Sequence, residues 1–301
     1  MFNILEISRM TTHNGPGYRT NVHFMGCPLS CKWCSTPESQ PLTGLGFNAA
    51  RCIGCGACAA VCPAGALAHS PGQPVALDRT ACTQCFACTG ECFSGALWKY
   101  GKPFTLEKLL EEILKDTAFF RHSGGGVTFS GGECLMQVND EMVELYAALH
   151  RAGVTIGIDT CGHVPWTNIQ RILPYTSFFL WDIKLLDPDR HKQYTGVDNR
   201  LILSNLRALS SAGSAQLYIR CPLIPEINDS DQDIEALCRL LQELDQYEEV
   251  HFLPFHHLGM NRYLYCGRPY LMGSAQRQSD QKLAHICQLA RSHGVPCRIV
   301  G

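Results

Sequence analysis

The stretch Gly-Cys-Pro-Leu-Ser-Cys-Lys-Trp-Cys at residues 26–34 contains three cysteines at the spacing C-x3-C-x2-C, and no fourth cysteine lies close behind it. A [4Fe–4S] cluster normally takes four thiolate ligands, so three thiolates leave one iron with an open coordination position. Catalytic metal sites keep a position open in the same way, whereas structural zinc sites, the alternative for such a stretch, use four ligands. We therefore predict that Cys27, Cys31 and Cys34 hold a reactive cluster that binds a small molecule, rather than a passive electron carrier.

The composition around this stretch is that of a globular protein. Hydrophobic residues make up 46% of the 301 residues and charged residues 17%, which argues against long disorder and allows one large domain or two smaller ones. The net charge of −2 gives no electrostatic reason to expect nucleic acid as a partner. No apolar run approaches the roughly 20 residues that span a bilayer, so we expect no membrane association.

The chain contains 18 cysteines, which could form disulfides only in an oxidising compartment. Residues 1–10 lack the basic region and apolar core of a signal peptide. Many of the cysteines also fall in clustered C-x2-C runs, which favours metal ligation over disulfides. We therefore expect a protein of the reducing cytoplasm.

Residues 46–100 hold eight of these cysteines in two copies of the pattern C-x2-C-x2-C-x3-C, each followed shortly by Gly-Ala-Leu. This is the bacterial ferredoxin pattern, in which the fourth cysteine of each run ligates the other cluster; two four-cysteine zinc sites are the alternative. We predict an inserted ferredoxin-like module with two closed, electron-carrying [4Fe–4S] clusters, and a catalytic domain made of residues 1–45 and 101–301. The expected ligands are Cys52, Cys55, Cys58 and Cys92 for one cluster, and Cys82, Cys85, Cys88 and Cys62 for the other.

Outside the insert, short apolar stretches alternate with stretches of helical periodicity. This alternation predicts an α/β fold with a parallel sheet and helices outside it. Six such units indicate a partial (β/α)6 barrel, with a doubly wound sheet as the alternative. The expected strands are 21–24, 127–130, 155–159, 178–183, 216–220 and 251–255. The expected helices are 105–120, with Thr105 as N-cap, and 139–152, 199–211, 231–244 and 274–293.

Polar and glycine residues follow the predicted strands, where parallel α/β folds bind their ligands. Gly131 and Gly132 come after the second strand and would let the backbone approach a ligand closely. The adjacent Glu133 can pair with an ammonium group, although an ordinary strand–helix turn is the alternative.

Charged side chains stand at the ends of the later strands. Asp159, Asp182, Lys184 and Arg220 end strands in apolar company, and His256 lies just beyond the sixth. Buried charges are costly unless they are paired. We expect Asp159, with the adjacent Thr160, and Asp182 with Lys184 either to form a salt bridge inside the barrel or to bind ligand at its mouth.

Taken together, these motifs resemble those of one family, the glycyl radical enzyme activating enzymes of the radical S-adenosylmethionine (SAM) class. Residues 14–20, Asn-Gly-Pro-Gly-Tyr-Arg-Thr, resemble that family's D-G-P-G-x-R. Residues 34–39 resemble its C-x-N-P-E-S, and residues 253–263 resemble its L-P-[FY]-H-x-L-G-x-x-K-Y. The resemblance covers nearly the whole chain, and the insert is similar to that of the family's longer members. Two residues depart from the family pattern, Asn14 in place of aspartate and Thr36 in place of asparagine.

The resemblance implies roles for the residues singled out above. SAM would lie on the cluster of Cys27, Cys31 and Cys34, with its amino group held by the Gly-Gly-Glu stretch. Lys184 and Arg220 are implied to take part in catalysis. The positions implied to line the SAM and peptide site or an adjoining monovalent-cation site are Trp33, Gly131, Gly132, Glu133, Asp159, Asp182, Lys184, Arg220 and His256.

The resemblance also implies the reaction. Flavodoxin or ferredoxin would deliver an electron, and SAM would be cleaved to methionine and a 5′-deoxyadenosyl radical. That radical would take a hydrogen atom from a glycine of a partner glycyl radical enzyme, which makes the chain an oxidoreductase. The alternatives are a radical SAM enzyme that acts on a small molecule and a multi-cluster electron carrier that performs no chemistry.

Overall fold

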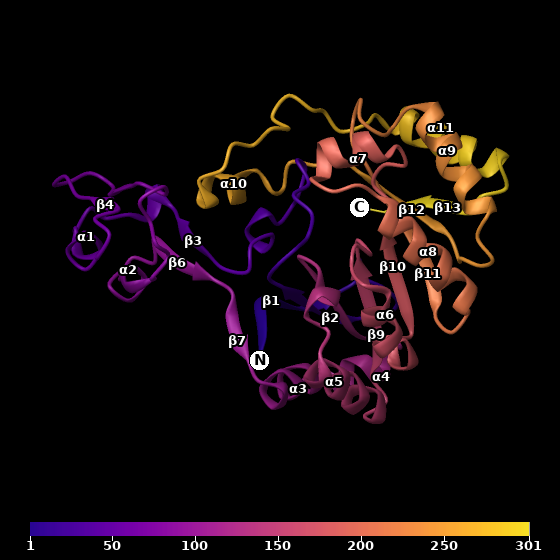
Figure 1. Ribbon diagram of the computed structural model, residues 1–301, viewed down its shortest axis with the longest axis horizontal. Helices are drawn as coiled ribbons and strands as arrows, with labels where there is room; N and C mark the ends of the chain where they lie inside the picture. The colour runs from indigo at the N-terminus through magenta and orange to yellow at the C-terminus, as the bar shows by residue number, and fades with distance from the viewer. Residues whose placement is uncertain (301) are drawn as a thin grey trace.

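The fold is built on one nine-stranded sheet, which a computed structural model describes together with the rest of residues 1–300 (Figure 1). The strand order is β13-β12-β11-β10-β9-β8-β2-β1-β7, and all neighbours from β2 to β13 are parallel. Each of the six predicted strands is present, so the expectation of an α/β fold with a mostly parallel sheet is confirmed. The bounds are β1 (Phe2–Thr11), β2 (Arg19–Phe24), β7 (Lys102–Phe104), β8 (Gly126–Gly131), β9 (Thr155–Thr160), β10 (Phe178–Asp182), β11 (Gln216–Leu223), β12 (Val250–Pro254) and β13 (Cys297–Ile299).

Three of these strands were not predicted. β1 and β7 extend one edge of the sheet in antiparallel pairing, and β13 adds a parallel strand at the other edge. β1 alternates only weakly between buried and half-exposed positions, and β7 and β13 have three residues each. Elements this short carry little periodic signal.

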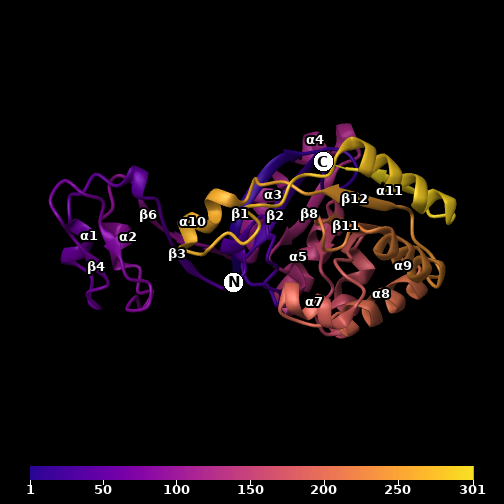
Figure 2. The same ribbon diagram turned by 90° about the horizontal axis from the view of Figure 1, so that it is seen from above.

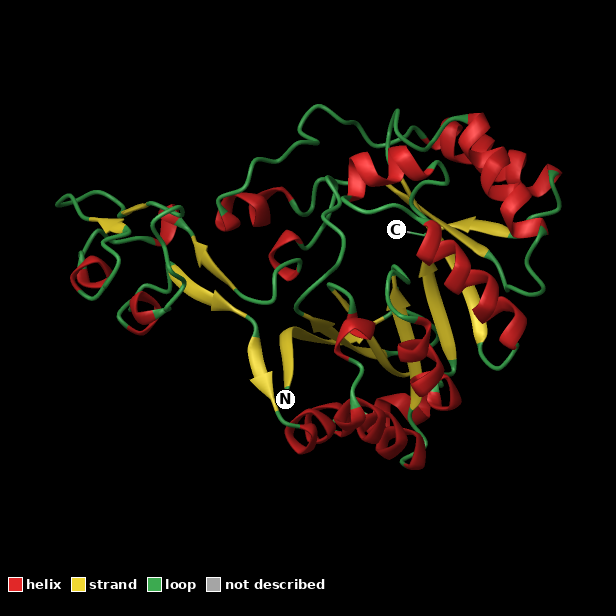
Figure 3. Cartoon of the chain, in the orientation of Figure 1, coloured by secondary structure: helices red, strands yellow, loops and turns green. Residues whose placement is uncertain are grey.

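Helices cover the outer face of the curved sheet, and α3, α4 and α5 lie beneath it in the view of Figures 1 and 3. Thr105 caps α3 as predicted, because its side chain accepts a hydrogen bond from the backbone N of Lys108 at 3.3 Å. The bounds are α3 (Leu106–Leu114), α4 (Thr117–Ser123), α5 (Asp140–Arg151), α6 (Trp166–Ile172), α7 (Pro188–Thr195), α8 (Arg200–Ala212), α9 (Asp231–Gln242), α10 (Met260–Cys266) and α11 (Asp280–Ser292).

Two helix predictions were wrong in extent. The expected helix over 105–120 breaks at Asp116, whose buried carboxylate accepts a hydrogen bond from the Thr20 hydroxyl at 2.5 Å and also pairs with Arg9. The helix expected from residue 274 begins only at Asp280, where the side chain of Ser279 caps it. In both places a polar side chain ends or starts the helix, and helical periodicity alone does not locate such residues.

Residues 44–100 form a separate lobe at one end of the molecule, which we call the cysteine-rich module (Figure 2). Its base is an antiparallel pair of β3 (Gly44–Phe47) and β6 (Leu97–Tyr100). The module also contains α1 (Ala57–Ala60), β4 (Leu67–Ala68), β5 (Ala76–Leu77) and α2 (Ala87–Gly90). Its small apolar core includes Leu67, Val75 and Leu97, so the module packs on itself as well as on the sheet domain.

The duplication within the module extends to its backbone. In the first copy Gly54 and Gly56 have positive φ values of 67° and 74°. Their counterparts Gln84 and Phe86 keep that conformation, at 55° and 63°, although neither is glycine. A side chain in the left-handed region costs about 1–2 kcal/mol per residue, so the surrounding structure must impose this geometry on both copies.

A buried arginine connects the segment before β2 to the sheet. Arg19 is 1% exposed, and its guanidinium donates to the Thr128 hydroxyl at 2.6 Å and to the carbonyls of Val127 and Thr155 at 2.5 and 2.9 Å. It also lies over the ring of Phe178, with 4.7 Å to the centroid. Arg19 also donates to the carbonyl of Pro16 at 3.2 Å, and the Thr128 hydroxyl donates to that of Asn14 at 2.7 Å, which fixes the loop before β2 against the sheet.

Arg19→Lys is expected to lower the free energy of unfolding by about 2–4 kcal/mol, because one ammonium group leaves several buried acceptors without a donor. Denaturant unfolding followed by circular dichroism measures this change. Arg9→Lys is the matched control, since Arg9 forms part-exposed ion pairs whose loss costs about 1 kcal/mol or less. Equal effects of the two substitutions would contradict this account of Arg19.

Within residues 1–300, no helix combines the length and the apolar character that crossing a bilayer requires.

Candidate functional site

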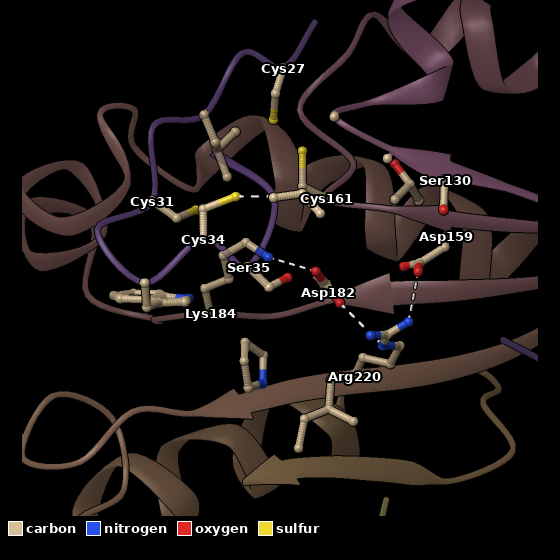
Figure 4. Close-up of a pocket in the computed structure, with 18 of the residues that line it drawn as sticks. Cys27, Cys31, Cys34, Ser35, Ser130, Asp159, Cys161, Asp182, Lys184 and Arg220 are labelled. Carbon is tan, nitrogen blue, oxygen red and sulfur yellow. Dashed lines mark hydrogen bonds and ion pairs between the residues drawn. The ribbon is translucent and has the colours of Figure 1, made fainter. Parts of the chain in front are cut away.

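A cavity of about 320 Å³ opens at the carboxyl ends of the parallel strands (Figure 4). Its wall is formed by the loop after β2, by the ends of β8 to β11, and by the segment after β12. Of the residues expected at the site, those that line the cavity are Cys27, Cys31, Trp33, Cys34, Gly131, Gly132, Asp159, Asp182, Lys184, Arg220 and His256.

The three cysteines belong to a loop whose backbone is held on two sides. The N–H groups of Gly26 and Cys27 donate to the carbonyls of Ser39 and Gln40 at 2.7 and 2.9 Å, and that of Ser30 donates to a carbonyl at the end of α7 at 2.7 Å. Burial raises the pKa of the Cys31 thiol. Three sulfur donors around one cavity, on a loop fixed from both sides, fit the three-thiolate ligand set of an open [4Fe–4S] cluster.

The two glycines after β8 allow that strand's end to approach the cysteine loop. Gly131 has a φ of 104°, and a Cβ atom there would lie 2.3 Å from the backbone N of Phe24. A Cβ atom at Gly132 would lie 2.2 Å from the carbonyl oxygen of Gly26. Side chains at either position would push the two loops apart, so the cavity wall here is backbone.

Glu133 is placed differently from the expectation that its carboxylate meets an ammonium group. The side chain is 0% exposed, does not line the cavity, and lies behind its wall. One oxygen accepts from the backbone N of Leu135 at 3.0 Å. The other accepts from the Thr160 hydroxyl and the Cys161 backbone N, both at 2.8 Å, and from the Cys161 thiol at 2.9 Å. The carboxylate therefore holds protein loops, and burial raises its pKa despite these hydrogen bonds.

Four charged side chains form a chain of ion pairs along the cavity wall. Asp159 accepts from Arg220 at 2.7 Å, and Asp182 accepts from Lys184 at 2.6 Å (Figure 4). Arg220 Nε also faces Asp182 Oδ1 at 3.6 Å, which links the two pairs. The two alternatives left open by the sequence therefore coincide, because the residues pair with one another and also face the cavity.

Burial decides the electrostatics of these groups. It raises the pKa of Asp159 to about 6, and the neighbouring Arg220 offsets only part of that shift. For Lys184, burial alone would lower the pKa, but Asp182 together with the thiols of Cys31 and Cys161 raises it overall. Lys184 is thus a cation next to the cysteine loop, and its charge would stabilise thiolates there.

The remaining wall residues lie at the mouth and the floor. His256 is exposed, and Trp33 is half-buried and packs on Tyr194 with ring centroids 6.2 Å apart. Asn14 and Thr36, the two departures from the family pattern, both line the cavity.

Sequence reasoning assigned no role to several further wall residues. His23 and Ser130 line the cavity, as does Cys161, whose thiol contacts Glu133. Thr160, which follows Asp159 and was expected at the ligand site, lines it as well. Ser130 donates to the side chain of Asn21 at 2.8 Å. Their positions at the ends of β2, β8 and β9 could have predicted that they line the site, since the carboxyl ends of parallel strands share one edge of the sheet.

The eight cysteines of the module line two small cavities. The first, which we call the Cys52 cavity, is lined by Cys52, Cys55, Cys58 and Cys92. The second, the Cys82 cavity, is lined by Cys62, Cys82, Cys85 and Cys88. Among residues 1–300, no three Cys, His, Asp or Glu side chains converge on the position of a single metal ion.

Residues 21–241 of this chain match the sequence pattern of the Radical SAM superfamily. Among characterised relatives, the (2S)-3-sulfopropanediol dehydratase activating enzyme of Klebsiella oxytoca is 39% identical over 310 residues, which cover 99% of this chain and 96% of the relative. The trans-4-hydroxy-L-proline dehydratase activating enzyme of Clostridioides difficile is 38% identical and covers 99% of both chains. The choline trimethylamine-lyase activating enzyme of Oleidesulfovibrio alaskensis is also 38% identical, over 99% of this chain and 97% of the relative.

Two solved structures share the fold. A domain of a pyruvate-formate lyase-activating enzyme from Bacteroides vulgatus is 26% identical, with a TM-score of 0.50 over 59% of this chain and 100% of the domain. A radical SAM methyltransferase from Sphaerobacter thermophilus is 15% identical, with a TM-score of 0.57 over 100% of this chain and 77% of its own. The chain belongs to the radical SAM superfamily and, within it, to the enzymes that activate glycyl radical enzymes.

Glu133→Gln is expected to lower the free energy of unfolding by about 1–3 kcal/mol, because an amide group would point a donor at backbone and hydroxyl donors that now meet a carboxylate. Thermal unfolding under anaerobic conditions measures this loss. Glu144→Gln, an exposed position on α5, should leave stability unchanged. If Glu133→Gln kept full stability and lost only SAM affinity, the carboxylate would bind ligand directly and the placement described here would be wrong.

Proposed function

We propose that this chain uses an open cluster at Cys27, Cys31 and Cys34 to cleave SAM and to abstract a hydrogen atom from a glycine of a partner enzyme. In this proposal the curved sheet and its helices act as a partial (β/α)6 barrel around the cavity. One observation carries the proposal, namely that three cysteines and a chain of buried ion pairs line a single cavity in a protein 38–39% identical to activating enzymes.

When held by Cys27, Cys31 and Cys34, a cluster would supply the electron for cleavage of a carbon–sulfur bond of SAM, and the residues around it would hold the ligand. Gly131 and Gly132 present backbone groups at close range on one side of the cavity. Lys184 and Arg220 offer cationic groups to a carboxylate on the other side. Asp159 and Asp182 are carboxylates that can meet an ammonium group, since both face the cavity and Glu133 does not.

Apolar side chains complete the wall and exclude water from the reacting atoms. Leu29, Ile224 and Phe255 line the cavity and are at most 4% exposed. A carbon radical needs such shielding, because a closed site prevents side reactions. His256 lies exposed at the rim, where a segment of the partner enzyme would enter.

We further propose that the cysteine-rich module holds two closed [4Fe–4S] clusters that carry electrons from flavodoxin or ferredoxin. The grouping of its cysteines supports this proposal, because each of the two cavities is lined by four cysteines in the alternating arrangement of bacterial ferredoxins. With the three-cysteine site, the chain would contain three clusters.

Cys31→Ala is expected to abolish the formation of 5′-deoxyadenosine, because two thiolates cannot hold the open cluster. Chromatography after anaerobic incubation with SAM and dithionite measures the product. Cys221→Ala is the matched control, since Cys221 is also buried at 5% exposure but does not line the cavity. Product formation by Cys31→Ala at the wild-type rate would overturn the proposed function.

Cys55→Ala is expected to reduce the iron content of the chain by about one third, from about twelve to about eight atoms per chain. It should also leave dithionite-driven SAM cleavage largely intact, because Cys55 lies in the module and not at the cavity. Iron analysis and Mössbauer spectroscopy provide the measurement. A wild-type chain with only about four iron atoms would contradict the two-cluster module and leave the SAM site unaffected.

A further inference from the structure

A second sizeable cavity, of about 220 Å³, separates the cysteine-rich module from the sheet domain; we call it the interface cavity. On the module side it is lined by Cys82, which also lines the Cys82 cavity. On the other side it is lined by Pro37 and Glu38, which follow Cys34 by only three and four residues. The interface cavity therefore lies between one four-cysteine site and the chain segment that leaves the three-cysteine site.

The walls of the interface cavity contain buried polar atoms without partners. Glu38 is 4% exposed, and while one of its oxygens pairs with Arg262, the other has no hydrogen-bond partner. The hydroxyl of Thr43 is also buried and unpartnered. A cavity of about 220 Å³ has room for ordered water, which would satisfy both groups.

Arg79 spans the interface directly. Its guanidinium donates to the carbonyl of Leu45 at 2.8 Å, within the module, and to the carbonyl of Tyr265 on α10 at 2.7 Å. Within residues 1–300, neither Arg79 nor Arg268, a second wall residue, forms an ion pair with a carboxylate. Their positive charges are therefore available to an anionic group next to Cys82, such as a thiolate-ligated cluster.

The Cys52 cavity has different surroundings. It is lined by Ile53 and Phe93, which are 69% and 90% exposed. When the two copies of the duplicated sequence are aligned on their cysteines, Ala49 is at the position that corresponds to Arg79. Figure 1 shows α10 facing the module from the side of β3 and β6. Among residues 1–300, the site of Cys82 thus has an arginine that contacts the sheet domain, and the Cys52 cavity has no counterpart of it.

We propose that the two four-cysteine sites are inequivalent, and that the site of Cys62, Cys82, Cys85 and Cys88 alone exchanges electrons with the three-cysteine site across the interface cavity. This proposal rests on the two-cluster module proposed above. In the proposed transfer, one electron leaves the site of Cys62, Cys82, Cys85 and Cys88 (the Cys82 site), which is oxidised. The electron enters the site of Cys27, Cys31 and Cys34 (the three-cysteine site), which is reduced. The electron is replaced by the external low-potential donor. Arg79 is a positioning residue that fixes the module against α10 and stabilises the added negative charge at the Cys82 site.

Spin relaxation in the complete, cluster-loaded protein tests which site is nearer, because a neighbouring paramagnetic cluster speeds the relaxation of another. We expect Cys85→Ala to slow the relaxation of the reduced, SAM-bound three-cysteine signal several-fold in pulsed EPR. Cys55→Ala, the corresponding position of the other copy, should leave this relaxation unchanged. Iron analysis on both variants verifies that each has lost only one cluster. The opposite assignment, or equal effects of the two variants, would overturn the proposal.

A second measurement keeps all cysteines. In an EPR redox titration, Arg79→Gln should shift one of the two module signals to a more negative midpoint and leave the other in place. Arg51→Gln, which removes a charge next to Cys52, should not shift that same signal. Arg79→Gln should also slow SAM cleavage driven by a protein donor several-fold. An unchanged midpoint would overturn the role of Arg79, whereas a wild-type protein with four iron atoms would instead show that the module holds no clusters.

Discussion

The buried carboxylate of Glu133 is the interaction on which the site depends. Its oxygens join the turn after β8 to Thr160 and Cys161 at the end of β9, and its own backbone N donates to the carbonyl of Gly26 at 2.7 Å. One residue therefore fixes three loops that all border the cavity. A fully buried carboxylate needs donors to offset its lost hydration, and here four donors lie within 3.0 Å of its oxygens, three of them at Oε2. The resulting rigidity lets the glycine backbone and the cysteine loop lie within contact distance.

The chain of ion pairs also stabilises the cavity wall, in this case through the pairing of opposite charges. Buried charges that were paired only by a bound ligand would destabilise the ligand-free protein. In this protein Asp159, Arg220, Asp182 and Lys184 compensate one another in advance. A ligand that carries both an ammonium group and a carboxylate can then exchange partners with these side chains without leaving any charge unpaired. The chain of ion pairs is thus compatible with ligand binding. It stabilises the ligand-free protein, and its charged groups can still pair with a zwitterionic ligand.

Much of the fold could be predicted because its strands are apolar and regularly spaced. All six expected strands are present, and the expected edge of the sheet does collect Cys27, Gly131, Asp159, Lys184 and Arg220. The predictions that were wrong concerned features that depend on individual side chains. The break at Asp116 follows from a tertiary hydrogen bond to Thr20, and the role of Glu133 follows from donors 27 and 28 residues away. Local patterns carry no information about such distant partners, and a glutamate next to two glycines looks the same whether it faces a ligand or the core.

The duplicated module shows how one sequence pattern can serve two environments. The two copies share their four cysteines and the Gly-Ala-Leu that follows, and they share the left-handed backbone at Gly54 and Gln84. These common features are the ones that surround each four-cysteine cavity. The two sites differ in their surroundings, because the exposed Phe93 lines the Cys52 cavity, whereas Arg79, bound to α10, lines the interface cavity together with Cys82. Divergence confined to the surroundings changes the field around each site while the ligand geometry stays the same. In this chain the difference between the two sites lies at the contact with the sheet domain, where Arg79 binds α10.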